Sequence, residues 1–144
     1  MSAENVEVVR EAMALADDAR NADLSQPALD DLIQRLSDLI ATDAQIDMSG
    51  RVFNPDVYTG EAGLRRLLRE IREVWHEFRV TPERFVDAGD RVVVIESIRG
   101  RGRTSDVPVE SRSASVWTLR DGRIIHMKTS YDPQEALEAV GLEG

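Results

Sequence analysis

The chain contains no cysteine among its 144 residues, which excludes disulfide bonds, thiolate metal sites and cysteine nucleophiles. It has only two histidines, and without carboxylates at ligand spacing they predict no metal site. No apolar run approaches about 18 residues, so the sequence predicts no membrane-spanning helix. The opening residues, MSAENVEVVREAM, are charged and lack the apolar run of a signal peptide, so we expect a cytoplasmic protein.

Positive charge is also scarce. The formal net charge is -9, which argues against nucleic acid or an anionic membrane as a partner, because both are polyanions. Residues 1–50 carry eleven acidic and three basic residues, a net charge of -8. The remaining residues are nearly balanced, with sixteen acidic and fifteen basic residues. The acidic excess therefore indicates solvated helix faces near the start of the chain.

Apolar spacing predicts three helices before the middle of the chain. The first covers residues 4–20, and the second follows an N-cap at Ser25 and carries an apolar stripe through Leu39 and Ile40. A short strand is expected around Ile46. The third and clearest helix lies within residues 54–78, NPDVYTGEAGLRRLLREIREVWHEF, and includes Trp75 and Phe78 in its stripe.

After Arg79 the apolar period changes to two, which predicts strands. Two strands meet near Gly89 and Asp90, and two more meet at Asp121-Gly122, a strong hairpin signal. Asp132 can cap a short last helix. The order of elements predicts one α+β domain over residues 1–144, with helices on one face of a curved sheet.

Four segments carry a resemblance to a known family: ENVEVVREAM, YTGEAGLRRLL, DAGDRVVVIESIRGRG and VWTLRDGRIIHMKTSYDPQEALEAVGL. In their order and spacing the chain resembles the SnoaL-like branch of the nuclear transport factor 2-like superfamily, in particular small stand-alone actinobacterial proteins. The resemblance implies a cystatin-like α+β cone. In such a cone a strongly curved antiparallel or mixed sheet wraps the N-terminal helices and a long central helix around a deep apolar pocket.

Members of this superfamily include ketosteroid isomerases, polyketide cyclases, scytalone dehydratase and limonene-epoxide hydrolase, none of whose chemistry the fold alone assigns. The ketosteroid isomerase residues fall here on Ala12 or Met13, Met48 and Ser115, none of which matches the expected role. Asp47, next to Met48, is a weak candidate for the base, because it serves only if the strand slips by one residue.

The other chemistries of the superfamily are not matched either. The hydrolase triad falls on Thr129, Glu96 and Ile98, which cannot form two carboxylates and an arginine. A cyclase would use a carboxylate with a nearby histidine, but His76 is expected at the edge of the long helix. His126 faces outward if the neighbouring apolar residues Ile125 and Met127 face inward. Whether the protein is an enzyme is therefore open.

One catalytic candidate stands on physical grounds. Glu96 lies in VVVIESI, a strand too apolar for an ordinary surface strand, and the family register points it into the cone. A carboxyl group there would be desolvated and its pKa raised, as a general acid or base requires. The alternative is that Glu96 pairs with an arginine such as Arg112 across the sheet.

Strand alternation places further side chains toward the expected pocket. Ser113, Ser115 and Trp117 share one face of their strand, and Thr129 and Tyr131 share one face of the last strand. The alternative is a mixed polar face within the core. The complete set expected to line the pocket is Met13, Met48, Tyr58, Trp75, Ser113, Ser115, Trp117, Met127, Thr129 and Tyr131.

The most basic stretch, SIRGRGRTSD, belongs to this sheet. Arg99, Arg101 and Arg103 share one face by alternation and are expected to face outward, toward solvent, a dimer partner or carboxylates such as Glu110. The intervening glycines permit a bend in the sheet.

Three functions remain open. The first is a cofactor-independent isomerase, cyclase or hydrolase that acts on a small hydrophobic oxygenated molecule, with Glu96 as acid or base. The second is a module that binds a lipophilic metabolite without transforming it, and the third is a structural dimerisation domain whose cavity is filled by side chains. We expect a small hydrophobic partner, no cofactor, and a homodimer formed through the outer face of the sheet.

Overall fold

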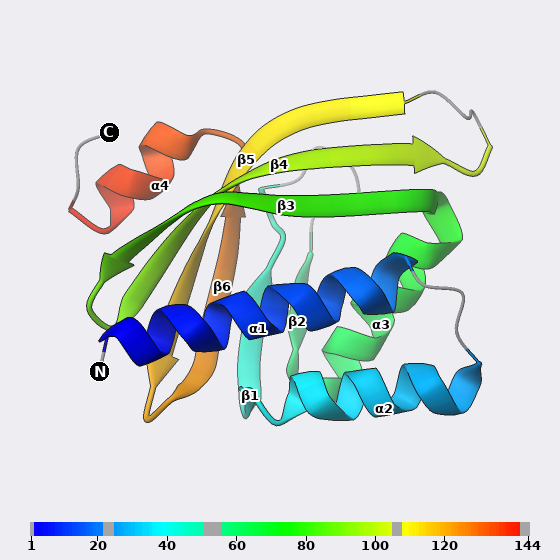
Figure 1. Cartoon of the computed structure of the whole chain (residues 1–144), viewed down its shortest axis with the longest axis horizontal. Coiled ribbons are helices and arrows are strands. Elements are labelled where there is room, and N and C mark those ends of the chain that lie inside the picture. Colours follow the sequence, from blue (N-terminus) through cyan, green and yellow to red (C-terminus); the bar gives the residue numbers. More distant parts are fainter. Residues whose placement is uncertain (1, 22–24, 51–55, 105–107, 142–144) are drawn as a thin grey trace.

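The computed structural model describes residues 2–21, 25–50, 56–104 and 108–141 (Figure 1). Within those residues the helices are α1 (Ser2–Asn21), α2 (Gln26–Ser37), α3 (Gly60–Val74) and α4 (Pro133–Ala139). The strands are β1 (Ile40–Asp47), β2 (Val57–Thr59), β3 (Trp75–Ala88), β4 (Arg91–Gly102), β5 (Pro108–Arg120) and β6 (Arg123–Ser130).

The strands form one mixed sheet in the order β2-β1-β6-β5-β4-β3. The β1–β6 pair is parallel, and every other neighbouring pair is antiparallel. The sheet bends along β3, β4 and β5 without closing into a barrel (Figure 1). The expected α+β cone is therefore confirmed.

The sheet is covered on both faces. Val92 and Val94 of β4 pack into the larger core with α1, α2 and α3, while the alternate residues Val93 and Ile95 pack with α4. The expectation that all helices lie on one face is therefore wrong for α4. This helix covers part of the outer face, through which we expected the homodimer to form.

Two helix boundaries differ from the prediction. Helix α2 ends at Ser37, and Ile40 already begins β1. Helix α3 ends at Val74, where Trp75 takes an extended conformation (φ -110, ψ 131) and pairs with Gly102 of β4. Because strand pairing with β4 outweighs the helical spacing of these apolar residues, Trp75, His76 and Phe78 lie on β3. Residues 51–55, at the start of the predicted helix, lie outside the described residues.

The predicted caps and the hairpin are confirmed. The Ser25 side chain accepts a hydrogen bond from the Ala28 backbone N–H, and the Asp132 side chain accepts one from Gln134. Asp121 and Gly122 both adopt positive φ angles, 52° and 77°, as a two-residue turn between β5 and β6 requires.

Arg99, Arg101 and Arg103 are all exposed, and Arg103, just after β4, donates from Nε to the Arg72 carbonyl oxygen at the end of α3. Arg99 pairs with Glu110 at 3.2 Å, and both side chains are exposed. Gly100 faces the other way, beneath the ring of Trp75, where a Cβ would lie 2.9 Å from the ring atom Cζ3. The glycine therefore allows the indole of β3 to lie directly against β4.

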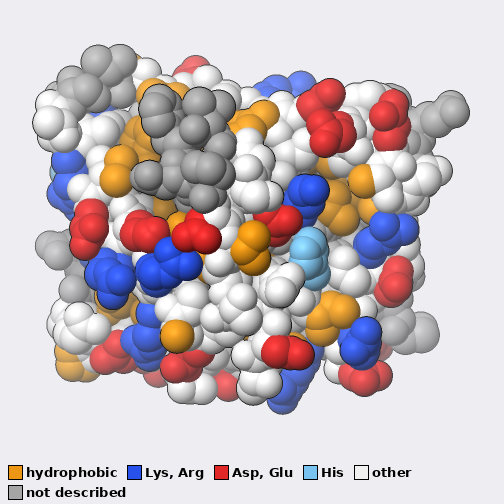
Figure 2. Space-filling view, turned by 180° about the vertical axis from the view of Figure 1, so that it is seen from behind, with side chains coloured by type: hydrophobic (Ala, Val, Ile, Leu, Met, Phe, Trp, Pro, Cys, Tyr) orange, Lys and Arg blue, Asp and Glu red, His pale blue; other side chains and the backbone are white. Residues whose placement is uncertain are grey.

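The surface seen from behind carries both signs of charge. Figure 2 shows basic and acidic side chains interspersed, with hydrophobic side chains in small separate groups. Ion pairs such as Arg66–Asp56 and Arg65–Asp30, both at 2.9 Å, connect several of the arginines of this acidic chain to carboxylates.

Candidate functional site

A cavity of about 490 Å³ lies between the concave face of the sheet and helices α1 and α3. Its wall is mostly apolar, with Leu64, Leu67 and Leu68 from α3 and Ala12 and Met13 from α1. This volume is within the range of small-molecule sites, about 300–1,000 Å³. The cavity is therefore large enough to hold a bicyclic or tricyclic organic molecule.

All ten residues expected to line the pocket lie on the wall of this cavity. They come from α1, β2, β3, β5 and β6 and from the residues that directly follow β1 and β6: Met13, Met48, Tyr58, Trp75, Ser113, Ser115, Trp117, Met127, Thr129 and Tyr131. Tyr131 is also 49% exposed, which places it where the cavity meets solvent.

Glu96 points into the cavity from β4 and is only 4% exposed. Its carboxyl oxygens accept hydrogen bonds from Ser113 Oγ at 3.2 Å and Ser115 Oγ at 3.4 Å, both on the neighbouring strand β5. Trp117 Nε1 donates to Ser115 Oγ at 2.7 Å. Because that oxygen accepts from the indole, its own proton is free to point at Glu96.

Burial raises the pKa of Glu96 from 4.5 to about 7. The hydrogen bonds from Ser113 and Ser115 and the charge of Arg20 act in the opposite direction but do not outweigh the desolvation. Near neutral pH this carboxyl group is therefore divided between its charged and neutral forms, and it can both accept and donate a proton.

The arginine near Glu96 is not the one considered from the sequence. Arg112 donates to Glu83 at 2.8 Å, so the alternative considered for Glu96, a pair with Arg112, does not form. The guanidinium that reaches the cavity belongs to Arg20, in the last turn of α1. A signal for it exists in the sequence, because the apolar stripe through Val9, Met13 and Ala16 continues at helical spacing to position 20.

The weak candidate Asp47 lies elsewhere. Its neighbours Ile46 and Met48 line the cavity, but Asp47 is not among the lining residues. Its carboxylate accepts hydrogen bonds from the side chain and backbone of Ser49, which lower its pKa. The one-residue slip that Asp47 would need is absent, since β1 pairs Ile46 with Tyr58 and Met127 in the described register.

A second carboxylate on the wall was not predicted. Glu70 of α3 accepts a hydrogen bond from the Tyr58 hydroxyl at 2.8 Å, and both residues line the cavity. The Arg66 guanidinium lies 4.2 Å from the centre of the Tyr58 ring and 3.6 Å from the Glu70 carboxylate. This carboxylate is therefore already paired with a cation and a phenol.

Neither histidine lines the cavity. A bulge between β5 and β6 leaves Ile125 without a partner on β5. Ile124 and Met127 are three residues apart and would face opposite sides of a regular strand, but because of the bulge both line the cavity.

In the part of the chain that the structure describes, no three acidic or histidine side chains gather to hold a metal ion. Likewise, no described helix has the length and apolar character needed to span a membrane.

The chain belongs to the SnoaL-like domain family, whose model matches residues 29–127. No curated protein matches the chain.

Solved structures with the same fold are similar over almost the whole chain. A nuclear transport factor 2-like protein from Burkholderia xenovorans LB400 has 22% identity and a TM-score of 0.73, with 98% of each chain covered. A protein with a ketosteroid isomerase-like fold from Catenulispora acidiphila, in complex with trimethylamine, has 18% identity and a TM-score of 0.68, covering 94% of this chain and 93% of that one. TerC, co-crystallised with polyporic acid, has 21% identity and a TM-score of 0.69, covering 95% and 98%.

Proposed function

We propose that this protein is a cofactor-independent proton-transfer enzyme that acts on a small, largely apolar molecule bearing a carbonyl oxygen, with Glu96 as the general acid and base. The observation that supports this most directly is a carboxyl group that is 4% exposed on the wall of a 490 Å³ cavity, with a pKa near 7. A pKa near the working pH makes a group effective in both directions of proton transfer.

The chemistry would begin with the charged form of Glu96. One oxygen removes a proton from a carbon next to the carbonyl group, and the electron pair of the C–H bond moves to form an enolate. The neutral Glu96 then returns the proton to another carbon of a conjugated enolate, which completes an isomerisation. Alternatively, the enolate carbon attacks a second carbonyl and closes a ring, and Glu96 gives its proton to the resulting alkoxide oxygen. Ser113 and Ser115 hold the carboxyl group in place through both steps.

The rest of the wall suits such a substrate. Met13, Met127 and Trp117 offer apolar contact, and the Thr129 hydroxyl makes only a long contact, 3.7 Å, to the Met48 sulfur. That hydroxyl can therefore turn toward a polar atom of the substrate. TerC, which has the same fold, was co-crystallised with polyporic acid, and this supports an organic molecule as the ligand.

The test measures proton transfer without the natural substrate. Wild-type protein is incubated in D₂O with a panel of bicyclic ketones, including 2-tetralone, and deuterium uptake next to the carbonyl is followed by NMR. We expect uptake above the buffer rate, and a loss of about a hundredfold or more in Glu96→Gln, in line with general acid–base catalysis. Glu70→Gln is the matched control, because it removes the other carboxylate of the wall. Equal rates in wild type and Glu96→Gln would refute the proposal.

A binding module is the second candidate. It is favoured by the unmatched catalytic sets of the superfamily and by the occupation of Glu70 with Tyr58 and Arg66. Ligand binding with no deuterium uptake by any ketone would support it over the enzyme. The open cavity argues against a purely structural domain, because Trp75 and Trp117 lie on its wall and do not fill it.

A further inference from the structure

Arg20 is a cation that the fold buries without satisfying it. Its side chain is 13% exposed and lies on the wall of the cavity. Among the residues that the structure describes, its only ion pair is a long contact, 3.4 Å from Nη2 to Asp17 Oδ1. Its Nε–H is buried and finds no hydrogen-bond partner among the described residues. A buried donor without an acceptor is unfavourable, which indicates that an acceptor comes from elsewhere.

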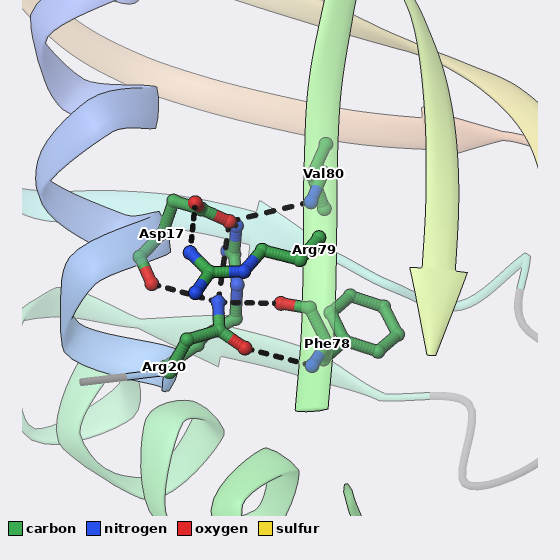
Figure 3. A network of polar contacts seen from close by, with 6 residues as sticks. Asp17, Arg20, Phe78, Arg79 and Val80 are labelled. Carbon is green, nitrogen blue, oxygen red and sulfur yellow. Dashed lines mark hydrogen bonds and ion pairs between the residues drawn. The ribbon is translucent and has the colours of Figure 1, made fainter. Parts of the chain in front are cut away.

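The hydrogen bonding of the Asp17 carboxylate does not depend on Arg20. Its carboxylate accepts a hydrogen bond from Arg79 Nη1 at 3.0 Å, from Asn21 Nδ2 at 3.3 Å and from the Val80 backbone N–H at 3.3 Å. Figure 3 shows this network, which connects the end of α1 to the first part of β3. The hydrogen bonds of Arg79 and Asn21 therefore connect the helix to the strand, and this connection does not require Arg20.

The other surroundings of Arg20 do not neutralise it. Its guanidinium carbon lies 5.8 Å from the centre of the Phe78 ring, a weak cation–π contact. Burial lowers its pKa, while Asp17 and Glu96 act in the opposite direction. An arginine remains charged at neutral pH. The Glu96 carboxyl group is only partly ionised there, so it offers incomplete compensation.

We propose that Arg20 is the anion-binding residue of the cavity and that its ligand is a small hydrophobic molecule carrying a negatively charged oxygen. This inference rests on the proposed function, because it names the substrate class of the same cavity. The charge can be permanent, as in an aromatic carboxylate. It can also form during the reaction, when Glu96 takes the proton from carbon and the electron pair leaves the negative charge on the enolate oxygen. In both cases the anionic oxygen accepts a hydrogen bond from the Arg20 guanidinium and compensates its buried charge.

The experiment uses two probes of the same shape. Binding of 2-naphthoate and of the neutral 2-naphthamide is measured by quenching of tryptophan fluorescence, since both tryptophans of the chain line the cavity. We expect wild type to prefer the anion by about tenfold or more, the size of a hydrogen bond to a charged group. Arg20→Gln should lose this preference, and Arg79→Gln should keep it. Arg79 is the matched control, because it also contacts Asp17 but does not line the cavity.

The two sources of charge give different results. Loss of naphthoate preference in Arg20→Gln supports a permanent anion. An unchanged preference, together with slower deuterium uptake into 2-tetralone, supports the enolate. No change in either measurement overturns the inference, as does an equal loss in Arg20→Gln and Arg79→Gln, which would point to the Asp17 network.

Two further measurements keep the test decisive. If Arg20→Gln does not fold, wild-type protein labelled with ¹⁵N is titrated with both probes. The Arg20 Nε–H resonance, assigned by its absence in Arg20→Lys, should move with 2-naphthoate and not with 2-naphthamide, and no movement refutes the inference. Glu96→Gln separates this inference from the proposed function, because it should abolish deuterium uptake while retaining naphthoate binding.

Discussion

Burying Glu96 makes the stability of the protein depend on pH in an unusual direction. Its pKa is about 7 in the folded chain and near 4.5 when the chain is unfolded and the carboxyl is hydrated. Between these values the unfolded chain has lost the proton and the folded chain retains it. The contribution of Glu96 to stability is therefore fully present below about pH 4.5 and is lost as the pH rises to about 7. At about 1.4 kcal/mol per pH unit, the loss is about 3 kcal/mol.

The substitution Glu96→Gln removes this dependence while keeping the shape of the side chain. Urea unfolding of wild type and variant at about pH 4.5 and pH 8 gives four free energies of unfolding. We expect the difference between wild type and variant to shift by about 3 kcal/mol between the two pH values, in favour of the variant at pH 8. Taking this difference cancels the contributions of other titrating groups, including Asp47 and Asp30, whose pKa values are lowered.

A second variant tests the cause. The hydrogen bond from Ser113 lowers the pKa of Glu96, so Ser113→Ala should move the pH at which stability is lost upward. A difference between wild type and Glu96→Gln that stays constant within about 0.5 kcal/mol over this pH range would show that Glu96 is hydrated in the folded protein. A hydrated Glu96 would not have a raised pKa, and the proposal that it acts as an acid and base would then be refuted.

The packing of the cavity wall gives further expectations. Gly100→Ala should lower the free energy of unfolding by about 1–3 kcal/mol and shift the tryptophan emission, because the new methyl group would overlap the Trp75 ring. Asn21→Ala should cost about 2 kcal/mol in urea unfolding, since its amide makes 2.7 Å hydrogen bonds to both the backbone N–H and the C=O of Phe78. Arg20→Met should leave stability unchanged or raise it, because it replaces an unsatisfied buried cation with an apolar side chain of similar length. A marked loss of stability in Arg20→Met would indicate a structural role for the guanidinium.

The residues facing the cavity from the strands were predictable because side-chain alternation is fixed by the backbone. Once Glu96 was placed inward on β4, the paired strand β5 had to bring Ser113 and Ser115 to the same face. The turn at Asp121-Gly122 set the register of β6 in the same way. Bulges interrupt this relation at Ile125 of β6 and at two places in the β3–β4 pairing, and no turn residue marks the one at Ile125 in the sequence.

The end of α3 could not be found from periodicity. Ile71, Val74, Trp75 and Phe78 keep a spacing of three and four residues, which suits a helix. The same residues have high strand propensity, and the partner strand β4, which decides between the two, lies about 25 residues further along the chain. Local spacing therefore predicts a helix that continues through Trp75 and Phe78, which belong to β3 in the structure.

Arg20 and Glu70 were missed for a different reason. A charged residue on a helix is normally solvated, so the sequence does not distinguish these two from the other charged residues beside the apolar stripes of α1 and α3. Their positions on the cavity wall depend on how the helices sit over the sheet, and a single sequence does not contain that packing. Glu96 was found because its strand is apolar on both sides of it, which makes a carboxylate conspicuous.

Two polar groups on one cavity wall oppose the folding of this chain. Glu96 destabilises the folded state as it ionises, and the buried Arg20 Nε–H has no acceptor in the described part of the chain. Stability alone would favour apolar residues at both positions. Local violations of this kind are expected where a protein reserves groups for a ligand. In the proposed function, the carboxyl group exchanges protons and the guanidinium donates hydrogen bonds to the anion that results. That proposed reaction, with its anionic intermediate, accounts for both groups, whereas a passive apolar cavity accounts for neither.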